Sequence, residues 1–126
     1  MFLFNLCEKR GSGMDRAVAG IEAMRLPAIT IERGEDFTRA RLFPLKKYTD
    51  MTRSEKVQAC YQHTCLLYEQ GKVLTNQSLR DRLSIGKNNA AVASRIISDT
   101  IAAGLIKAQE DQSASTKFWG YVPYYV

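Results

Sequence analysis

Apolar residues recur three and four positions apart in the second half of the chain, which is the spacing of helices with one buried face. The first such stretch covers residues 52–70. It opens with Thr52 and Glu55, a capping box whose hydroxyl and carboxylate satisfy two backbone amides, and Gly71 follows as a helix terminator. The positions expected to point inward are Val57, Cys60, Tyr61, Thr64, Leu67 and Tyr68.

Two more helices are predicted after this one. Thr75 is a good N-cap for a helix that carries Leu79 and Leu83 inward, and residues 84–86 form the turn after it. The third helix extends from about residue 88 to residue 103, and Gly104 ends it. Its expected core positions are Val92, Ile96, Ile97 and Ile101.

The pattern then changes to alternation, which is typical of strands. Residues 105–110 and 117–126 alternate on either side of the polar segment 111–116. Three helices followed by a β-hairpin is the order of a winged helix-turn-helix domain. We therefore expect such a domain over residues 49–126.

The first 48 residues predict a smaller segment. Val18, Ile21 and Met24 indicate a helix over residues 15–25, and Leu26 ends it because a residue before proline avoids the helical region. Residues 28–32 and 37–43 alternate around a glycine-containing loop, which predicts a β-hairpin, and residues 44–50 form a linker. The predicted fold class is α+β: a small helix plus β-hairpin segment over residues 1–48, followed by a winged helix-turn-helix domain.

Composition excludes several classes of protein. The 126 residues are 45% hydrophobic and 25% charged, as in ordinary globular proteins, and the apolar runs are too short to span a bilayer. The amino-terminal segment lacks the charge order and cleavage site of a signal peptide. Three cysteines without framework spacing favour a reducing compartment, so we expect a cytoplasmic protein.

The net charge of +5 is compatible with a polyanionic partner. The basic excess is not concentrated in the predicted winged helix, because residues 1–49 contain nine Lys and Arg against six Asp and Glu, and residues 50–126 contain nine against seven. A local stripe is more informative. Residues 80–95 contain Arg80, Arg82, Lys87 and Arg95 and only one acidic residue, Asp81.

The third helix is the expected recognition helix, because in a winged helix its amino-terminal half enters the major groove. Asn side chains pair with adenine there, and Arg side chains with guanine. The candidate contacts are Lys87, Asn88, Asn89, Ser94 and Arg95. The simpler interpretation makes the two asparagines a helix cap and Arg95 a solvated surface residue.

The second helix is expected to contact the DNA backbone, because helix N-termini favour phosphate. Thr75, Asn76 and Gln77 stand at its start, although a plain N-cap also explains Thr75. Arg80 and Arg82 are predicted to be phosphate contacts or solvated charges rather than residues that read bases.

The hairpin is expected to contact DNA lightly. Lys107 and Lys117 are placed for backbone contacts, whereas Glu110 and Asp111 at the tip would be repelled by phosphate. Four aromatic residues are expected to pack the hairpin on the helices or to form a dimer contact, rather than to stack on bases. These are Trp119, Tyr121, Tyr124 and Tyr125.

Two other groups of residues have the chemistry of possible ligand sites. Gly11-Ser12-Gly13 can bring backbone amides to a phosphate, but a turn at a helix start explains it better. Cys60, His63 and Cys65 point in three directions on one helix, so we expect two core thiols, a surface histidine and no metal site. With a single histidine and no paired carboxylates, the chain is not expected to be an enzyme or to bind a cofactor.

Several segments resemble known regulators. Residues 52–126 look like the winged helix-turn-helix modules of bacterial transcription regulators, above all in SRII (residues 94–97) and AAGLIK (residues 102–107). The segment EKRGSGMDR (residues 8–16), followed by a helix and a hairpin that ends in LFP (residues 42–44), resembles the end of one family. This is the family of transcriptional regulators named as ATP-dependent DNA helicase RecG-related.

The resemblance covers essentially the whole chain and implies that it is the carboxy-terminal portion of a longer protein. In the fuller architecture a Schlafen AlbA-type domain comes first, then a degenerate histidine-kinase-like ATPase segment, then a winged helix. The resemblance makes residues 11–13 the glycine box of the ATPase fold, whose Mg-ATP-binding helix would lie upstream. Isolated ATPase activity is therefore not expected, and nothing in the chain resembles a Walker A loop or a helicase motif.

The leading hypothesis is a DNA-binding carboxy-terminal part of a bacterial transcriptional regulator, with double-stranded DNA as partner. The alternative is a winged helix used as a protein-interaction or dimerisation module without direct DNA binding, which the modest charge of the second segment favours. Nucleotide binding at residues 11–13 is a third, weaker hypothesis. The first segment cannot enclose a core alone, so we expect it to pack on the winged helix or to form a homodimer.

Overall fold

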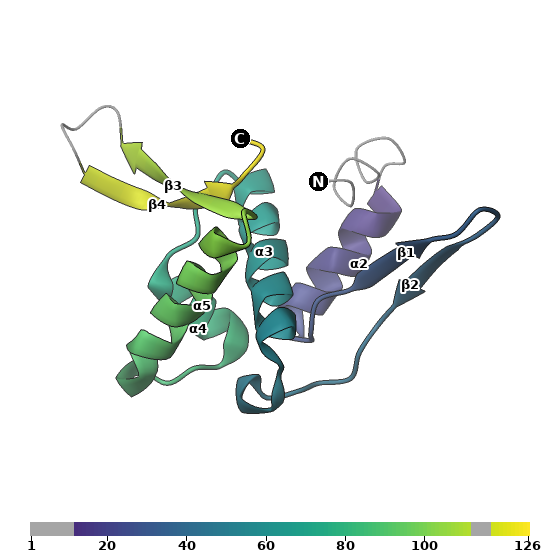
Figure 1. Cartoon of the computed structure of the whole chain (residues 1–126), viewed down its shortest axis with the longest axis horizontal. Coiled ribbons are helices and arrows are strands. Elements are labelled where there is room, and N and C mark those ends of the chain that lie inside the picture. Colours follow the sequence, from purple (N-terminus) through teal and green to yellow (C-terminus); the bar gives the residue numbers. More distant parts are fainter. Residues whose placement is uncertain (1–11, 112–116) are drawn as a thin grey trace. The chain divides into compact units, whose positions relative to one another are not determined.

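The computed structural model describes residues 12–111 and 117–126, and the side chains of residues 16–109 and 120–126. Over these residues the chain is an α+β structure with two small antiparallel hairpins (Figure 1). It divides into two compact units, residues 1–46 and residues 47–126, and each unit contains one of the hairpins.

The described part of the first unit begins with helix α2 (Ser12–Ala23), which starts and ends somewhat earlier than predicted. Val18 and Ile21 are buried, as expected. Met24 is not a core residue, because it lies beyond the helix end and is 68% exposed. The chain turns there: Arg25 takes a left-handed conformation (φ 56°), and the Leu26 amide donates to the Ile21 carbonyl at 3.0 Å.

The predicted hairpin of the first unit is confirmed, with shorter strands than the alternation suggested. Strands β1 (Thr30–Arg33) and β2 (Thr38–Arg41) are antiparallel, and Arg33 pairs with Thr38. The loop between them closes through a hydrogen bond from the Gly34 amide to the Phe37 carbonyl at 2.8 Å. None of the residues in these two strands is buried.

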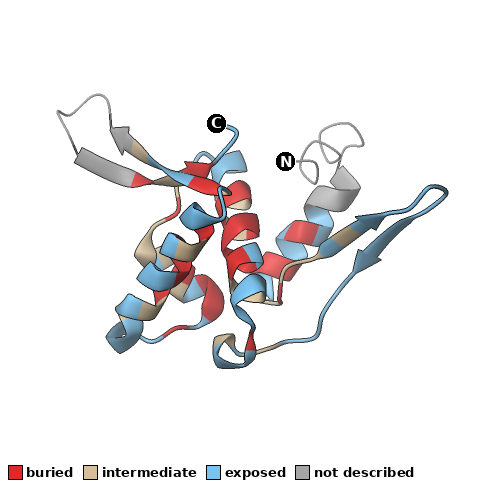
Figure 2. Ribbon diagram, in the orientation of Figure 1, coloured by how far each residue is buried: buried red, intermediate tan, exposed pale blue. Residues whose placement is uncertain are grey.

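The second unit is organised around helix α3 (Arg53–Glu69), which a short 3₁₀ turn, η1 (Tyr48–Asp50), precedes. The predicted capping box is present: the Glu55 amide donates to Thr52 Oγ1 at 3.2 Å, and the Thr52 amide donates to Glu55 Oε1 at 3.1 Å. The buried residues of α3 lie between Val57 and Cys65 and include four in a row, residues 59–62, so the middle of the helix is enclosed all the way round (Figure 2). Tyr68, the last predicted core position, is instead 40% exposed.

Helices α4 (Asn76–Leu83) and α5 (Ala90–Ala102) pack on α3 and on each other. Leu79 and Leu83 are buried as predicted, and so are Ile96 and Ile97. Ile101 is 41% exposed, and the fully buried Thr100 occupies the core position in its place. The Thr100 hydroxyl donates to the Ile96 carbonyl at 2.7 Å, so this polar group enters the core with its hydrogen bond made.

Gly104 ends α5 where the sequence predicted an end. Its φ of +76° is a left-handed conformation that glycine adopts without steric cost. The Gly104 amide donates to the Ile101 carbonyl at 2.9 Å, and the Leu105 amide donates to the Thr100 carbonyl at 3.3 Å. These two bonds satisfy carbonyls that the helix leaves open at its end.

The second hairpin is formed by β3 (Ile106–Asp111) and β4 (Lys117–Pro123), as predicted, with a bulge at Gln109 and Glu110. It lies across one end of the helices of its own unit (Figure 1). A feature that the sequence did not predict joins it to the chain before α4. Leu74 and Tyr121 exchange two backbone hydrogen bonds, each of 2.9 Å, and Leu74 is fully buried.

Candidate nucleic-acid interface

The predicted contacts at the start of α5 are all on the surface. Lys87, Asn88 and Asn89 form an exposed 3₁₀ turn, η2 (Lys87–Asn89), immediately before the helix. Asn89 Nδ2 lies 3.5 Å from the Tyr48 hydroxyl, and no side-chain hydrogen bond from Asn89 caps the helix. Ser94 and Arg95 are exposed on the first turns of α5. We call these five residues, with the exposed Ala91 and Ser98, the α5 strip.

From Lys87 to Ser98, the α5 strip carries positive charge and hydrogen-bonding groups and contains no acidic residue. No Asp or Glu occurs between Arg82 and Ser98. The first acidic residue after the strip, Asp99, forms an ion pair with Arg53, in which Arg53 Nη2 lies 2.8 Å from Asp99 Oδ1. The strip is therefore suited electrostatically to a polyanion.

Asn76 has a role that the sequence did not reveal. Its Nδ2 donates to the Ala90 carbonyl at 3.0 Å and to Ser94 Oγ at 2.9 Å, and its Oδ1 accepts from Arg80 Nε at 2.7 Å. The side chains of Asn76 and Ser94 thus join α4 to α5. The expectation that the Asn76 amide meets a phosphate is replaced by this internal role.

Thr75 is the N-cap of α4, as predicted, and this role is compatible with a phosphate contact by the same residue. Its Oγ1 accepts from the Ser78 amide at 3.1 Å, and Ser78 Oγ accepts from the Thr75 amide at 3.0 Å. Gln77 is exposed in the first turn of the same helix. The cap leaves the Gln77 side chain as the more accessible of these two candidates.

The two arginines of α4 differ. Arg80 is half-buried and bonded to Asn76 through Nε. Arg82 is only 4% exposed, and burial lowers the pKa of its guanidinium to about 10. Arg82 is therefore neither a phosphate contact nor a solvated charge, and that prediction is wrong.

The hairpin candidates are described only in part. Lys107 is exposed, and its Nζ donates to the Val126 carbonyl oxygen. Lys117 begins β4, but its side chain and that of Trp119 lie outside the described side chains. The tip, residues 112–116, also lies outside the described residues, so light contact by the hairpin stays a prediction.

The two described cysteines lie in the core, and the glycine-containing segment begins a helix. Cys60 and Cys65 are fully buried, as expected of core thiols, and burial raises the pKa of Cys60 to about 11. Ser12 and Gly13 are the first residues of α2, and Gly11 lies outside the described residues.

His63 is half-buried rather than a surface residue. Burial lowers its pKa from 6.5 to about 4, and a hydrogen bond with the Ser78 backbone and the negative charge of Asp81 oppose this shift only in part. The folded chain therefore binds a proton at this position less readily than the unfolded chain does.

This shift predicts a loss of stability in mild acid. The contribution of neutral His63 is fully present above pH 6.5 and is lost as the pH falls towards 4, because only the unfolded chain then gains the proton. Between pH 7.5 and 5.5 we expect the free energy of unfolding to fall by about 1.4 kcal/mol. Urea unfolding at both pH values measures the change. His63→Gln should remove most of this dependence, since the chain has one histidine; an equal dependence in the variant would contradict the assignment.

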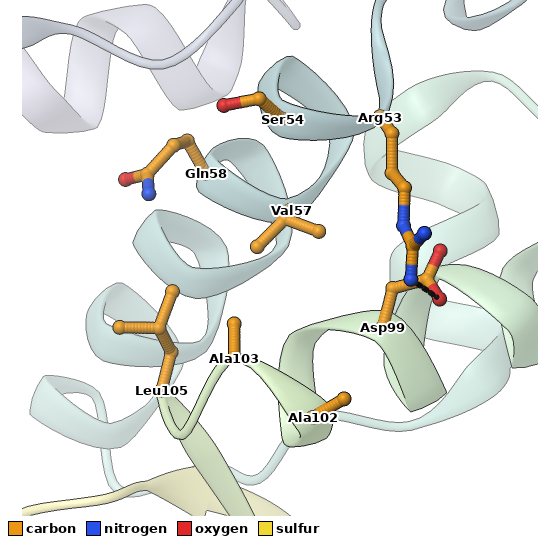
Figure 3. Close-up of a pocket in the computed structure, with 8 residues that line it drawn as sticks. All are labelled: Arg53, Ser54, Val57, Gln58, Asp99, Ala102, Ala103 and Leu105. Atoms are coloured by element: carbon orange, nitrogen blue, oxygen red, sulfur yellow. Dashed lines mark hydrogen bonds and ion pairs between the residues drawn. The ribbon is translucent and has the colours of Figure 1, made fainter.

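A second candidate surface is the open groove between the start of α3 and the end of α5, with a volume of about 710 Å³ (Figure 3). Val57, Ala103 and Leu105 line its apolar side. The guanidinium of Arg53 and the carboxylate of Asp99 point at each other at its edge. Because this charge pair is matched within the protein, the groove is less suited than the α5 strip to a polyanion.

Over the part of the chain that the structure describes, no helix is both long and apolar enough to cross a membrane. Comparisons of the chain with protein-family models, with curated proteins and with solved structures give no match.

Proposed function

We propose that residues 47–126 form a winged helix-turn-helix domain that binds double-stranded DNA, with α5 as its recognition helix. The observation that carries the proposal is the α5 strip, in which Lys87, Asn88, Asn89 and Arg95 are exposed together around the start of one helix. The order of three helices and a hairpin, with Leu74 bridged to β4, supports the fold.

Some of these side chains are suited to contact bases, and others are suited to contact the DNA backbone. Arg95 offers two parallel donors to guanine, and Asn88 and Asn89 each offer a donor and an acceptor to adenine. Lys87 and Arg80 are suited to phosphates, which fix the orientation of the protein on the duplex. Thr75, Gln77, Lys107 and Lys117 complete the proposed backbone contacts.

The proposal extends to the biological role. The resemblance of residues 8–16, 42–44 and 94–107 to regulators of the RecG-related family supports a bacterial transcriptional regulator of which this chain is the carboxy-terminal part. Residues 1–46 then serve as a connector or as a surface for homodimerisation.

A titration of the full chain on fluorescent random duplex DNA tests the proposal. The proposed cationic backbone contacts are Arg80, Lys87, Lys107 and Lys117. If each neutralises one phosphate, a plot of the logarithm of the binding constant against the logarithm of the salt concentration has a slope of roughly −3.6. Affinity should therefore fall on the order of a hundredfold between about 50 and 200 mM salt. No detectable binding at the lower salt concentration would contradict direct DNA binding.

The second candidate function is self-association through the same domain. Tyr68, Tyr124 and Tyr125 are 40%, 47% and 40% exposed, and the rings of Tyr124 and Tyr125 lie 5.5 Å apart at their centroids. Exposed aromatic clusters of this kind are common in protein interfaces. Light scattering on the full chain separates the two functions: a tight dimer that does not bind DNA would favour this one.

A further inference from the structure

The Asn76 side chain connects Arg80 to the recognition helix. It holds the Ala90 carbonyl and the Ser94 hydroxyl, one turn apart on α5, and Arg80 Nε on its own helix. We propose that Asn76 is a positioning residue, which aims the Arg80 guanidinium at a DNA phosphate and fixes α5 beside it. This inference rests on the proposed function.

An amide is the side chain that suits all three partners. The Ala90 carbonyl can only accept a hydrogen bond, and Arg80 Nε can only donate one. Reversing the amide would place Oδ1 against the Ala90 carbonyl and Nδ2 against the guanidinium, so the partners themselves fix its orientation. An alanine at position 76 would lose all three bonds, and a carboxylate would lose the bond to the Ala90 carbonyl because both groups only accept.

The bond to Asn76 determines how Arg80 meets a ligand. Because Nε donates to Oδ1 at 2.7 Å, the two terminal amino groups, Nη1 and Nη2, are the donors that remain for a ligand. They form a planar fork that matches two phosphate oxygens. The guanidinium is held before the DNA arrives, so binding does not have to order this long side chain.

The bonds to α5 hold the other half of the interface. Ala90 follows η2 directly, and Arg95 follows Ser94 directly. The two hydrogen bonds from the Asn76 amide therefore hold α5 at positions that lie between Lys87 and Arg95 in the sequence. The position of Arg80, which contacts phosphate, is thereby fixed relative to the position of Arg95, which contacts a base.

The test compares Arg80→Ala, Arg80→Lys, Asn76→Ala and the double variant N76A/R80A on random duplex DNA across a range of salt. Arg80→Ala should weaken binding about tenfold and reduce the salt slope by about one. Arg80→Lys keeps the charge but has neither the Nε–H that bonds to Oδ1 nor the planar fork, and should resemble Arg80→Ala within about threefold. Asn76→Ala, although it removes no charge, should also reduce the salt slope.

In the Asn76→Ala background, Arg80→Ala should cost less than about threefold, because the two residues act as a unit. Gln58→Ala, an exposed amide on α3, is the matched control and should bind like the unmodified chain. Arg80→Lys leaves the bonds from Asn76 to α5 in place, so it decides the matter even if Asn76→Ala does not fold.

The positioning role would be overturned if Arg80→Lys bound DNA with wild-type affinity. It would also be overturned if Asn76→Ala left the salt slope unchanged and Arg80→Ala kept its full effect in the Asn76→Ala background. Absence of binding by the unmodified chain and by Gln58→Ala would instead overturn the proposed function, and the positioning role with it.

Discussion

Replacing Lys87 and Arg95 together by alanine is expected to weaken duplex DNA binding on the order of a hundredfold. An arginine that contacts a base pair contributes about 1–3 kcal/mol, and loss of a lysine that contacts phosphate weakens binding to all sequences alike. Both side chains are exposed on the α5 strip, so their removal leaves the core unchanged. Fluorescence anisotropy at fixed salt measures the change on a duplex selected from a random pool for tight binding, because base contacts contribute little on random DNA.

The control is Lys72→Ala, which removes an exposed positive charge from the turn after α3. Lys72→Ala should reduce affinity much less than the double variant does, because it weakens only the general electrostatic attraction between the protein and DNA. Circular dichroism establishes that each variant is folded. If the double variant and Lys72→Ala bind equally well, α5 is not the recognition helix.

Gly120→Val is expected to destabilise the second unit by about 3 kcal/mol, near the upper end for overpacked sites. A Cβ at position 120 would lie 2.5 Å from Val73 Cγ2 and 2.8 Å from the Leu74 carbonyl oxygen. The backbone at Leu74 is fixed by its two hydrogen bonds to Tyr121 and cannot retreat without breaking them. Urea unfolding of the purified chain measures the free energy directly.

Gly86→Ala is the matched control for this substitution. A Cβ at Gly86 meets nothing within 4 Å, and its φ of −67° suits any residue, so the change in stability should stay within about 0.5 kcal/mol. If Gly120→Val unfolds at the same urea concentration as the unmodified chain, the close packing of β4 on residues 73–74 is absent in solution.

The location of the candidate interface was predictable, because it depends on local signals. Thr52 and Thr75 cap the starts of α3 and α4, and Gly104 ends α5. Each of these signals depends on hydrogen bonds or backbone conformation within a few residues of the chain. The exposed residues Lys87–Asn89 and Arg95 follow from these boundaries. The helix ends fix which residues begin α5, and the polar ones among them face solvent.

The division between core and surface was predictable only in part. Ile101 and Thr100 are adjacent on α5, and apolar character alone favours Ile101 as the inward residue. The structure buries Thr100 instead, and the Thr100 hydroxyl is satisfied there by the Ile96 carbonyl. Arg82 and His63 likewise lie in or near the core although their side chains are polar.

The sequence by itself determined the order of the helices and hairpins and the caps at Thr52, Thr75 and Gly104, because turns, caps and periodicity act between neighbours in the chain. Only the tertiary structure decided the contacts between residues far apart. The Leu74–Tyr121 bridge spans 47 positions and involves one residue pair, too short for any periodic signal. The Asn76 amide acquires its partners on α5 only when α4 and α5 pack, so its role depends on the meeting of two helices.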